Sequence, residues 1–481
     1  MNSASTHMNG KTAIGWVVAL TAIGSLMAAL DTLVVSTALS SIRRDLSASV
    51  EQLEWTVNAY NLSFAVLLIT AAALGDRYGR RSFYAIGLGL FAGASALSAL
   101  APSIGWLIAA RALQGAGAAL VLTLGLALLS AAFPPERRGA AIGLFSAVTG
   151  IAVAIGPLVG GAIAEGIDWE WIFWVNVPIG LAAVPLVLSR IEESYGGDSG
   201  LDLSGLALVS GGAFGIVWGL VRGNAVGWGS LEVVGALAAG LLLVGGFVAR
   251  ELRAQEPMLP IRLFRSRGFA AGNAAIFFTL ASLFGAVFFF AQMLQTALGY
   301  GPFDAGLRLM PWTITFITVA PVVGTLVDRF GERPFMVGGL TLQALGMSWI
   351  ALIADPGFSY SQFVLPSIVA GIGVSMAIPA AQNSVVGSVA LKDVGKAAGA
   401  NSMMRELGGV FGIAVGVAVF AAAGSYASAN AFLDGFAPAI AVVAALSAAG
   451  AVVSLALPGR RQANAAAPVG AVPALEADGA S

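Results

Sequence analysis

Apolar stretches of about 20 residues alternate with short polar segments along most of the chain. A run of about 20 apolar residues is long enough to cross a bilayer as an α-helix, whereas strands of a membrane β-barrel alternate apolar and polar positions. The pattern therefore predicts an all-α integral membrane protein. The predicted helices, fourteen in number, cover residues 13–38, 53–74, 82–101, 105–132, 140–164, 172–189, 203–221, 230–249, 269–298, 305–326, 335–354, 362–389, 397–423 and 435–457.

Composition supports a membrane protein, because 58% of the residues are hydrophobic and 10% are charged, against about 25% charged in soluble globular domains. Cysteine is absent, which excludes disulfides, iron–sulfur clusters and thiolate zinc sites. The single histidine, His7, lies in the polar N-terminal segment. We therefore expect no metal and no cofactor. No block of basic residues is typical of a nucleic-acid interface, so we expect no nucleic-acid partner.

Most of the 24 Lys and Arg residues fall in alternate loops between the predicted helices. Such residues accumulate in cytoplasmic loops, and their distribution here predicts that both termini are cytoplasmic. Residues 1–12 form a polar tail, and the apolar segment after them is too long for a cleavable signal peptide. The sequence thus predicts a multi-pass protein of the cell (plasma) membrane, with a disordered Ala- and Pro-rich tail over residues 458–481.

A seven-residue pattern occurs twice, as GDRYGRR over residues 75–81 and as VDRFGER over residues 327–333. We interpret each as the loop after the second helix of a six-helix unit. The chain then divides into two six-helix bundles, residues 13–190 and 269–457, separated by an inserted helix pair and a basic linker over residues 191–268. Two repeated halves around a site at the membrane midplane are typical of secondary transporters.

The repeated loop has a mechanical interpretation. Its aspartates lie where a carboxylate can face the positive end of a helix, and its arginines can pair with carboxylates or lipid phosphates. Its glycines permit a tight turn. We expect a conformational latch that holds the cytoplasmic ends of two helices together in one state, formed by Asp76, Arg77, Gly79, Arg80, Asp328 and Arg329. The alternative is a positively charged cytoplasmic loop that anchors the helix ends and happens to occur twice.

The segment GPLVGG, over residues 156–161, places a proline inside the fifth predicted helix. Proline removes a backbone hydrogen bond and bends a helix, while glycine lets a neighbouring backbone approach closely. We therefore expect a hinge at Gly156, Pro157, Gly160 and Gly161. Because Gly and Pro are common in membrane helices, a packing role without hinge motion is the alternative.

Four segments together resemble the motifs of the major facilitator superfamily: ALDTLVVSTALSSI (29–42), GDRYGRR (75–81), RALQGAGAA (111–119) and GPLVGG (156–161). The inserted helix pair, WEWIFWVNVPIG (169–180) and RELGGVFGIA (405–414) resemble, more narrowly, its fourteen-helix drug:proton antiporter subfamily. The resemblance covers the chain except for its two tails. It implies the major facilitator fold, and the similarity of GPLVGG to the superfamily's antiporter signature implies export rather than uptake.

The sequence departs from the family pattern at three positions. Ala72 stands where the loop motif usually has Gly. Glu170 stands where an Arg usually precedes the sixth helix, which puts the salt bridge of that Arg in question here. Glu406 stands where the subfamily often has Gln. The last change adds a carboxylate inside a membrane helix.

Ionisable residues are rare in the predicted helices, and such residues usually face a bundle interior or an aqueous cavity. Arg111 keeps its proton at any accessible pH, so it cannot carry a coupling proton itself. It can hold a carboxylate and change the proton affinity of that carboxylate, and Asp31 is the best candidate because both residues lie in the resembling motifs. A static buried ion pair is the alternative. The candidate proton-coupling residues are Asp31, Arg111, Glu406 and Glu54.

Glu54, Asn58 and Asn61 have the spacing i, i+4, i+7, which places them on one helix face. A polar stripe on a membrane helix must face a cavity or a neighbouring helix. Glu54 lies near the predicted extracellular end. It is therefore a candidate proton access point or cation-attracting rim, with an ordinary interfacial residue as the alternative.

Two other predicted helices carry polar residues. Asn401 and Arg405 share a face, while Glu406 points about 100° away from Arg405, so the two adjacent charges need not pair. The phenylalanine-rich helix over 269–298 is typical of an adaptable aromatic wall for lipophilic substrates, with lipid-facing rings as the alternative. The candidate substrate-cavity residues are Asn58, Asn61, Gln114, Phe288, Gln292, Gln295, Asn401 and Arg405.

Together these features predict a monomeric, proton-coupled antiporter embedded in the lipid bilayer. It exports small lipophilic compounds, including cationic or aromatic drugs, across the membrane by alternating access. A dedicated exporter of an endogenous metabolite, antibiotic or lipid is the main alternative, and GPLVGG disfavours an uptake symporter. A channel would need a continuous polar lining or a ring of like charges. An enzyme would need a nucleophile–base pair or a metal site. The sequence shows neither pattern, so we expect a transporter and not an enzyme.

Overall fold

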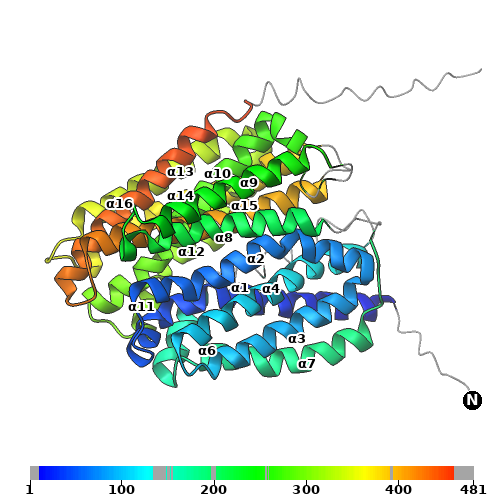
Figure 1. The fold of residues 1–481 in the computed structure, drawn as a ribbon, viewed down its shortest axis with the longest axis horizontal. Helices are drawn as coiled ribbons and strands as arrows, with labels where there is room; N and C mark the ends of the chain where they lie inside the picture. Colours follow the sequence, from blue (N-terminus) through cyan, green and yellow to red (C-terminus); the bar gives the residue numbers. More distant parts are fainter. Residues whose placement is uncertain are drawn as a thin grey trace, which may run out of the picture.

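The computed structural model describes residues 10–133, 148, 152, 155–196, 202–254, 257, 259, 261–389 and 394–459. Within these residues every regular element is a helix (Figure 1). The N-terminal half contains α1 (Gly10–Asp45), α2 (Val50–Tyr78), α3 (Arg80–Ala99), α4 (Ile104–Ala132), α6 (Trp171–Trp174) and α7 (Asn176–Arg190). The inserted pair is α8 (Leu203–Val226) and α9 (Leu231–Glu251). The C-terminal half contains η2 (Ile261–Arg265), α10 (Arg267–Gln292), η3 (Met293–Ala297), α11 (Pro302–Arg308), α12 (Met310–Phe330), α13 (Glu332–Ile353), α14 (Tyr360–Gly387), α15 (Val394–Ala423) and α16 (Ala429–Ser454).

The described residues contain 12 helices that are long and apolar enough to cross a membrane. The count is 13 if the bent pair Val50–Leu68 and Thr70–Tyr78, which meet at 50°, forms one span. The fourteen-span prediction stays a prediction, because most of the predicted helix over 140–164 lies outside the described residues. Two predicted helices are interrupted, since α6 gives way to α7 at Val175 and α11 gives way to α12 at Leu309.

Short polar residues and glycines set the helix ends at the loops. Ser49 starts α2 with a reciprocal cap, in which its side chain accepts from the backbone of Gln52 and its backbone donates to the Gln52 side chain at 2.9 Å. Gly79 and Gly331 have φ angles of 115° and 83°, a region that favours glycine. Because Gly79 joins α2 to α3 and Gly331 joins α12 to α13, the repeated motif forms a sharp turn in each half.

The two halves lie side by side, with the N-terminal half (blue to cyan) below the C-terminal half (yellow-green to orange) in Figure 1. Helix α2 packs against α15, and α8 packs against both of them. The first helix of the inserted pair therefore runs along one seam between the halves. Helix α9 packs on α8, and only 17% of its span is buried, so the pair presents α9 outward.

A hydrophobic cluster joins the two halves. It contains Val34 of α1 and Leu53 of α2, together with Phe288, Phe289 and Phe290 of α10. Each of the three phenylalanines is at most 2% exposed. The alternative that the rings of this helix face lipid is therefore wrong for these three residues, which fill the space between helices.

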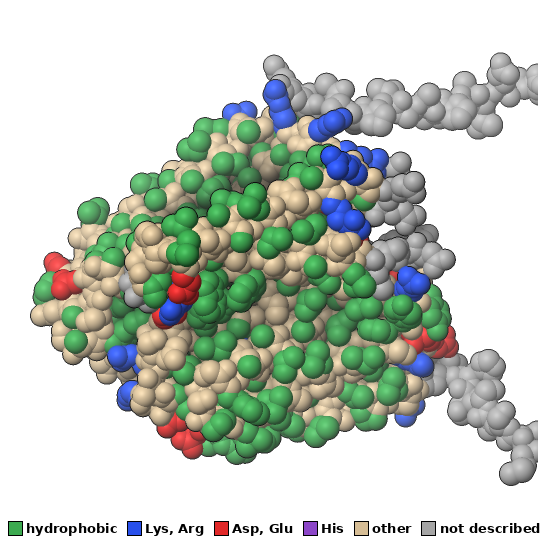
Figure 2. Space-filling model, in the orientation of Figure 1, with side chains coloured by type: hydrophobic (Ala, Val, Ile, Leu, Met, Phe, Trp, Pro, Cys, Tyr) green, Lys and Arg blue, Asp and Glu red, His purple; other side chains and the backbone are tan. Residues whose placement is uncertain are grey.

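Lys and Arg side chains gather along the right-hand edge of the molecule in Figure 2, the edge at which α1 begins in Figure 1. Apolar side chains are spread over the middle of the same face. A membrane protein has an apolar belt next to a basic cytoplasmic edge. The distribution agrees with the predicted cytoplasmic side, while the orientation itself stays a prediction.

Candidate functional site

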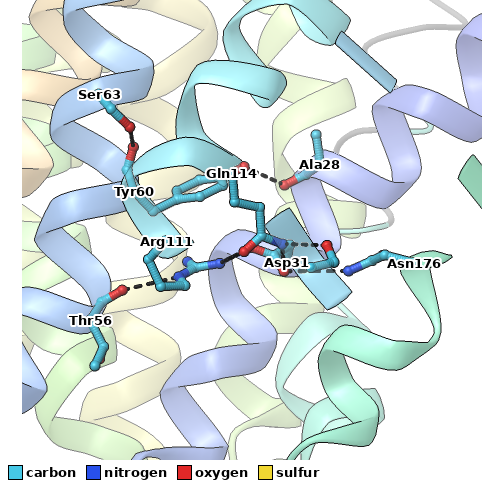
Figure 3. Close-up of polar contacts among 9 residues, drawn as sticks. Ala28, Asp31, Thr56, Tyr60, Ser63, Arg111, Gln114 and Asn176 are labelled. Carbon is cyan, nitrogen blue, oxygen red and sulfur yellow. Dashed lines mark hydrogen bonds and ion pairs between the residues drawn. The ribbon is translucent and has the colours of Figure 1, made fainter. Parts of the chain in front are cut away.

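A buried polar network surrounds the carboxylate of Asp31 in α1 (Figure 3). Nη1 of Arg111 donates to Asp31 Oδ2 and also to Gln114 Oε1, the latter at 2.8 Å. Gln114 Nε2 donates to Asp31 Oδ1 at 2.7 Å and to Ser95 Oγ at 2.9 Å, and Asn176 Nδ2 lies 3.5 Å from Asp31 Oδ1. The carboxylate of Asp31 thus receives donors from both α4 and α7, and the Asp31 and Arg111 side chains are each 1% exposed.

The guanidinium of Arg111 is held on its other side by α2. Its Nε donates to the carbonyl oxygen of Thr56 at 3.0 Å, and its central carbon lies 4.3 Å from the ring centroid of Tyr60 and 5.6 Å from that of Phe173. The Tyr60 hydroxyl donates to the carbonyl of Ala28 in α1 at 3.1 Å. A planar guanidinium satisfies several acceptors at once and stacks on rings, which an ammonium cannot do in the same way.

The network contains three of the residues that the sequence predicts to be functional: Asp31, Arg111 and Gln114. The structure brings Asp31 and Arg111 together, as the sequence predicts, while their role in proton coupling stays a prediction. Gln114, three residues after Arg111, is 0% exposed and bonds to the carboxylate through its amide nitrogen. It belongs to the Asp31 network rather than to an open cavity wall in this conformation.

The polar stripe of α2 is also closed to solvent. Glu54 and Asn58 are 0% exposed and Asn61 is 1% exposed. Asn58 Nδ2 donates to Glu54 Oε1 at 3.0 Å. Because the Glu54 carboxylate is fully buried, the interpretations of this residue as an exposed rim or an ordinary interfacial residue are wrong for this conformation.

The third group of predicted residues lies on α15. Arg405 Nε donates to Glu406 Oε1 at 3.0 Å, so the expectation that these neighbours need not pair is corrected by a direct ion pair. The long Arg stem reaches across the angle between the two positions, and the Glu406 side chain is 5% exposed. Asn401 Nδ2 lies 3.4 Å from Asn273 Oδ1 of α10. Among the described residues no hydrogen bond or ion pair connects Glu406 to Asp31.

The two glutamines near the end of α10 form structural contacts. Gln292 is 0% exposed, donates to the carbonyl of Phe288 at 2.5 Å and accepts a hydrogen bond from the Tyr426 hydroxyl. Gln295, in η3, donates to the carbonyl of Thr37 in α1 at 2.9 Å. The second contact joins the two halves of the molecule directly.

Further contacts between the halves lie at the same, predicted extracellular end. Glu165 Oε2 accepts from the backbone nitrogen of Phe303 at 2.8 Å. The guanidinium carbon of Arg43, near the end of α1, lies 4.3 Å from the ring centroid of Tyr426, between α15 and α16. These contacts close the molecule at this end.

Glycines of the predicted hinge motif make close approaches at this closed end. A Cβ added at Gly161 would lie 2.2 Å from the carbonyl oxygen of Pro302, and one added at Gly160 would lie 2.6 Å from that of Val34. Conversely, a Cβ at Gly306 would lie 2.4 Å from the carbonyl oxygen of Pro157. Gly156 is buried within the helical residues 155–166. The structure thus shows close packing at the motif, while hinge motion stays a prediction.

The N-terminal copy of the predicted latch contacts the segment after α7. Arg80 Nε pairs with Asp76 Oδ1 at 2.7 Å. The backbone of Arg80 donates to Ser194 O at 2.9 Å, and the backbone of Gly196 donates to Asp76 O at 2.9 Å. The guanidinium of Arg77 instead lies 5.4 Å from the Tyr78 ring centroid.

In the C-terminal copy, Arg329 lies 5.4 Å from the Phe330 ring centroid, and the side chain of Asp328 lies outside the described residues. The ion pair observed in the latch is that of Arg80 with Asp76 in the N-terminal copy, and a latch function stays a prediction.

Glu193 is a functional candidate that the sequence analysis missed. Its carboxylate accepts from the backbone nitrogens of Arg81 at 2.8 Å and Ser82 at 3.2 Å, and from Ser82 Oγ at 2.5 Å. Burial alone would raise the pKa of Glu193, but hydrogen bonds from Ser82, Arg81 and Ser194 and the Arg81 charge outweigh burial and lower the pKa. The carboxylate caps the start of α3, and because it is 111 residues from Ser82, no local sequence pattern reveals it.

Comparisons with known proteins show similarity to one family and to several resistance and export proteins. The sequence pattern of the family described as Major Facilitator Superfamily matches residues 21–294 and 273–475. The chain is 37% identical to the tetracenomycin C resistance and export protein of Streptomyces glaucescens, over 82% of this chain and 73% of that protein. It is 36% identical to the multidrug resistance protein Stp of Mycobacterium tuberculosis (84% and 75% covered) and 32% identical to the methylenomycin A resistance protein of Bacillus subtilis (85% and 88% covered).

Solved structures support the same fold at low sequence identity. The xylose transporter XylE from E. coli gives a TM-score of 0.61 at 14% identity, covering 93% of this chain and 98% of XylE. A bacterial homologue of the human lysosomal transporter Spinster gives a TM-score of 0.64 at 16% identity, also covering 93% and 98%.

Proposed function

The chain belongs to the major facilitator superfamily, and from this premise we propose that it is a proton-coupled efflux antiporter for small lipophilic compounds, cationic or aromatic ones among them. Its relatives are named for antibiotic and multidrug resistance and export, which supports efflux. Some of these names refer to a single antibiotic. A dedicated exporter of one metabolite, antibiotic or lipid is therefore the second candidate.

The observation that carries the proposal is the buried carboxylate of Asp31, which faces a guanidinium that cannot release its proton. Protonation of Asp31 removes one charge of the pair and weakens its bond to Arg111. Because α1, α2, α4 and α7 all contribute contacts to this network, a change at Asp31 alters how these helices hold one another. A proton can thereby bias the equilibrium between two arrangements of the halves.

The contacts at the predicted extracellular end support an alternating-access cycle. In this conformation, hydrogen bonds from Gln295 to Thr37 and from Phe303 to Glu165 join the halves. We propose that substrate binds from the cytoplasmic side in this state, and that these contacts break when the substrate leaves outward. Protons then enter at Asp31, with Glu406 and Glu54 as further proposed carboxylates.

The proposal also covers the orientation of the chain in the membrane, the latch and the hinge. A multi-pass protein with both termini cytoplasmic agrees with the basic edge seen in Figure 2. We propose that the chain acts as a monomer in the plasma membrane. The loop around Asp76 and Arg80 acts as the latch, and the helical residues 155–161 act as the hinge.

Everted membrane vesicles with an acidic interior provide the test. We expect lipophilic cations or neutral aromatic compounds to trigger proton efflux in vesicles that contain the wild-type protein, and not in vesicles that contain Asp31→Asn. Glu232→Gln is the matched control, because Glu232 lies at the exposed start of α9 and pairs with Arg222. If no compound moves protons, or if Asp31→Asn behaves as the wild type, coupling through Asp31 is excluded.

A further inference from the structure

The polar stripe of α2, formed by Glu54, Asn58 and Asn61, contains polar atoms that no part of the described chain pairs. One hydrogen bond joins Asn58 Nδ2 to Glu54 Oε1 at 3.0 Å. Glu54 Oε2, Asn58 Oδ1 and both polar atoms of Asn61 are buried and have no hydrogen-bond partner among the described residues. Unpaired polar atoms inside a membrane protein cost free energy. We therefore expect these atoms to form hydrogen bonds with a ligand or with water in another conformation of the protein.

The stripe faces the interface between the two halves. On one side of it, Leu53 belongs to the cluster that includes Phe288 of α10. On its other side, Leu62 and Val66 belong to a cluster with Val410 of α15. Positions 54, 58 and 61 lie between these two faces of the helix. Separation of the halves at the closed end therefore exposes the stripe, because Glu54 lies one turn from the start of α2.

The unpaired atoms favour one ligand chemistry. With Glu54 ionised, as it is before the protons enter, three of them accept hydrogen bonds, namely Glu54 Oε2, Asn58 Oδ1 and Asn61 Oδ1, while Asn61 Nδ2 donates. A complementary ligand must therefore offer more donors than acceptors at this point. Hydroxyl and amino groups on an aromatic ring meet this requirement, whereas a lipophilic cation without N–H or O–H groups does not.

We propose that Glu54, Asn58 and Asn61 form a ligand subsite that binds the hydroxyl or amino groups of aromatic substrates when the halves separate. The proposal deepens the export function above and rests on it. The subsite is closed in the present conformation, so a ligand that bonds to it favours the open state and assists its own passage outward. A site built to bond a substrate hydroxyl discriminates strongly against an analogue that lacks it.

Binding of 2,6-dihydroxyanthraquinone and of its dimethoxy analogue to the full chain in lipid nanodiscs tests the proposal. We expect the wild type to bind the dihydroxy compound at least about tenfold more tightly, the effect of roughly one hydrogen bond. In Asn61→Leu we expect this ratio to fall, because the variant removes one of the three acceptors and leaves those of Glu54 and Asn58. The thermal midpoint of Asn61→Leu should be unchanged or higher, because the variant removes two unpaired polar atoms from the interior.

Ser282→Ala is the control, because its buried hydroxyl accepts from Gln343 Nε2 at 3.1 Å and from Ser447 Oγ at 2.6 Å, and neither partner is a candidate cavity residue. This variant should lower the thermal midpoint and leave the affinity ratio unchanged. An unchanged ratio in Asn61→Leu, equal binding of the two compounds by the wild type, or a lower midpoint for Asn61→Leu would each overturn the subsite.

Transport of both compounds and of tetraphenylphosphonium in everted vesicles separates this proposal from the proposed function. Proton-coupled export without hydroxyl selectivity removes only the subsite. Selective binding without export of any of the three compounds supports the subsite and removes the export function.

Discussion

Arg111 lies 80 residues after Asp31 in the chain, yet its guanidinium meets the Asp31 carboxylate where both side chains are 1% exposed. Neither charge reaches water, so each depends on the other and on the amide groups around them. Removing one partner of a buried pair leaves an uncompensated charge, which is more costly than removing both. The pair is therefore testable through stability as well as through transport.

We expect Arg111→Gln to lower the free energy of unfolding by about 3–5 kcal/mol, because it leaves the carboxylate of Asp31 without its cation. The double variant Asp31→Asn/Arg111→Gln should lose less than the sum of the two single variants. Unfolding of the four proteins in mixed detergent micelles measures this coupling. Additive losses would show that the two charges do not depend on each other.

The contact between the start of α3 and the segment after α7 should depend on pH, because the ionisable carboxylate of Glu193 forms it. Its pKa is lowered in the folded protein, so its stabilising contribution is present above the unfolded carboxyl pKa of about 4.3 and is lost as the pH falls through the folded value. We expect Glu193→Gln to lower the thermal midpoint at neutral pH. The difference from the wild type should shrink as the pH falls below the carboxyl range.

Limited proteolysis between residues 190 and 196 reports the same contact locally. Cleavage should be faster in Glu193→Gln than in the wild type at neutral pH. Glu192→Gln is the matched control, because only its neighbour Glu193 accepts the hydrogen bonds from Arg81 and Ser82. Equal cleavage of all three proteins would show that Glu193 does not hold this segment.

The close approach of Gly161 to Pro302 predicts that a larger side chain at position 161 prevents the two halves from closing at this end. A Cβ at this position would lie 2.2 Å from the backbone oxygen of Pro302, which cannot move away as a flexible side chain can. We expect Gly161→Val to hinder closure and shift the protein towards the outward-open state. Labelling of Thr37→Cys, a position that is 0% exposed here, by a membrane-impermeant maleimide should then be faster.

Gly93→Val is the control for this substitution, because a Cβ at Gly93 in α3 would meet no atom of the described residues within 4 Å. It carries the same change of residue type in a membrane helix without the clash. Equal labelling in Gly161→Val and Gly93→Val would mean that the contact with Pro302 does not govern closure.

Much of the fold follows from local pattern, because an apolar run of the right length has few options in a bilayer other than a helix. The meeting of Asp31 with Arg111 also follows, since so few charges lie in the helices that the choice of partners is small. Interruptions are harder to foresee. The break at Leu309 and the π-helical segment after α10 depend on packing between helices, which sequence spacing does not express.

Three contacts at the candidate site cannot be predicted from the sequence for a related reason. The sequence indicates that Gln114 is a polar residue in a membrane helix, but its contacts with Asp31 and Ser95 depend on how α1 and α3 pack on α4. The pairing of Arg405 with Glu406 depends on side-chain reach, which a projection of helix positions ignores. Glu193 acts across more than 100 residues of chain. In each case a tertiary contact sets the role.

The absence of cysteine allows a final prediction about the cycle. Gln295 Nε2 donates to the carbonyl of Thr37 at 2.9 Å, so cysteines at these two positions lie within reach of a short bifunctional thiol reagent in the closed state. We expect cross-linked Thr37→Cys/Gln295→Cys to lose substrate-driven proton efflux, because the halves can no longer separate at this end. Each single-cysteine variant treated with the same reagent controls for modification alone. A cleavable reagent should restore efflux on reduction, and export at the wild-type rate by the cross-linked protein would exclude opening at this end.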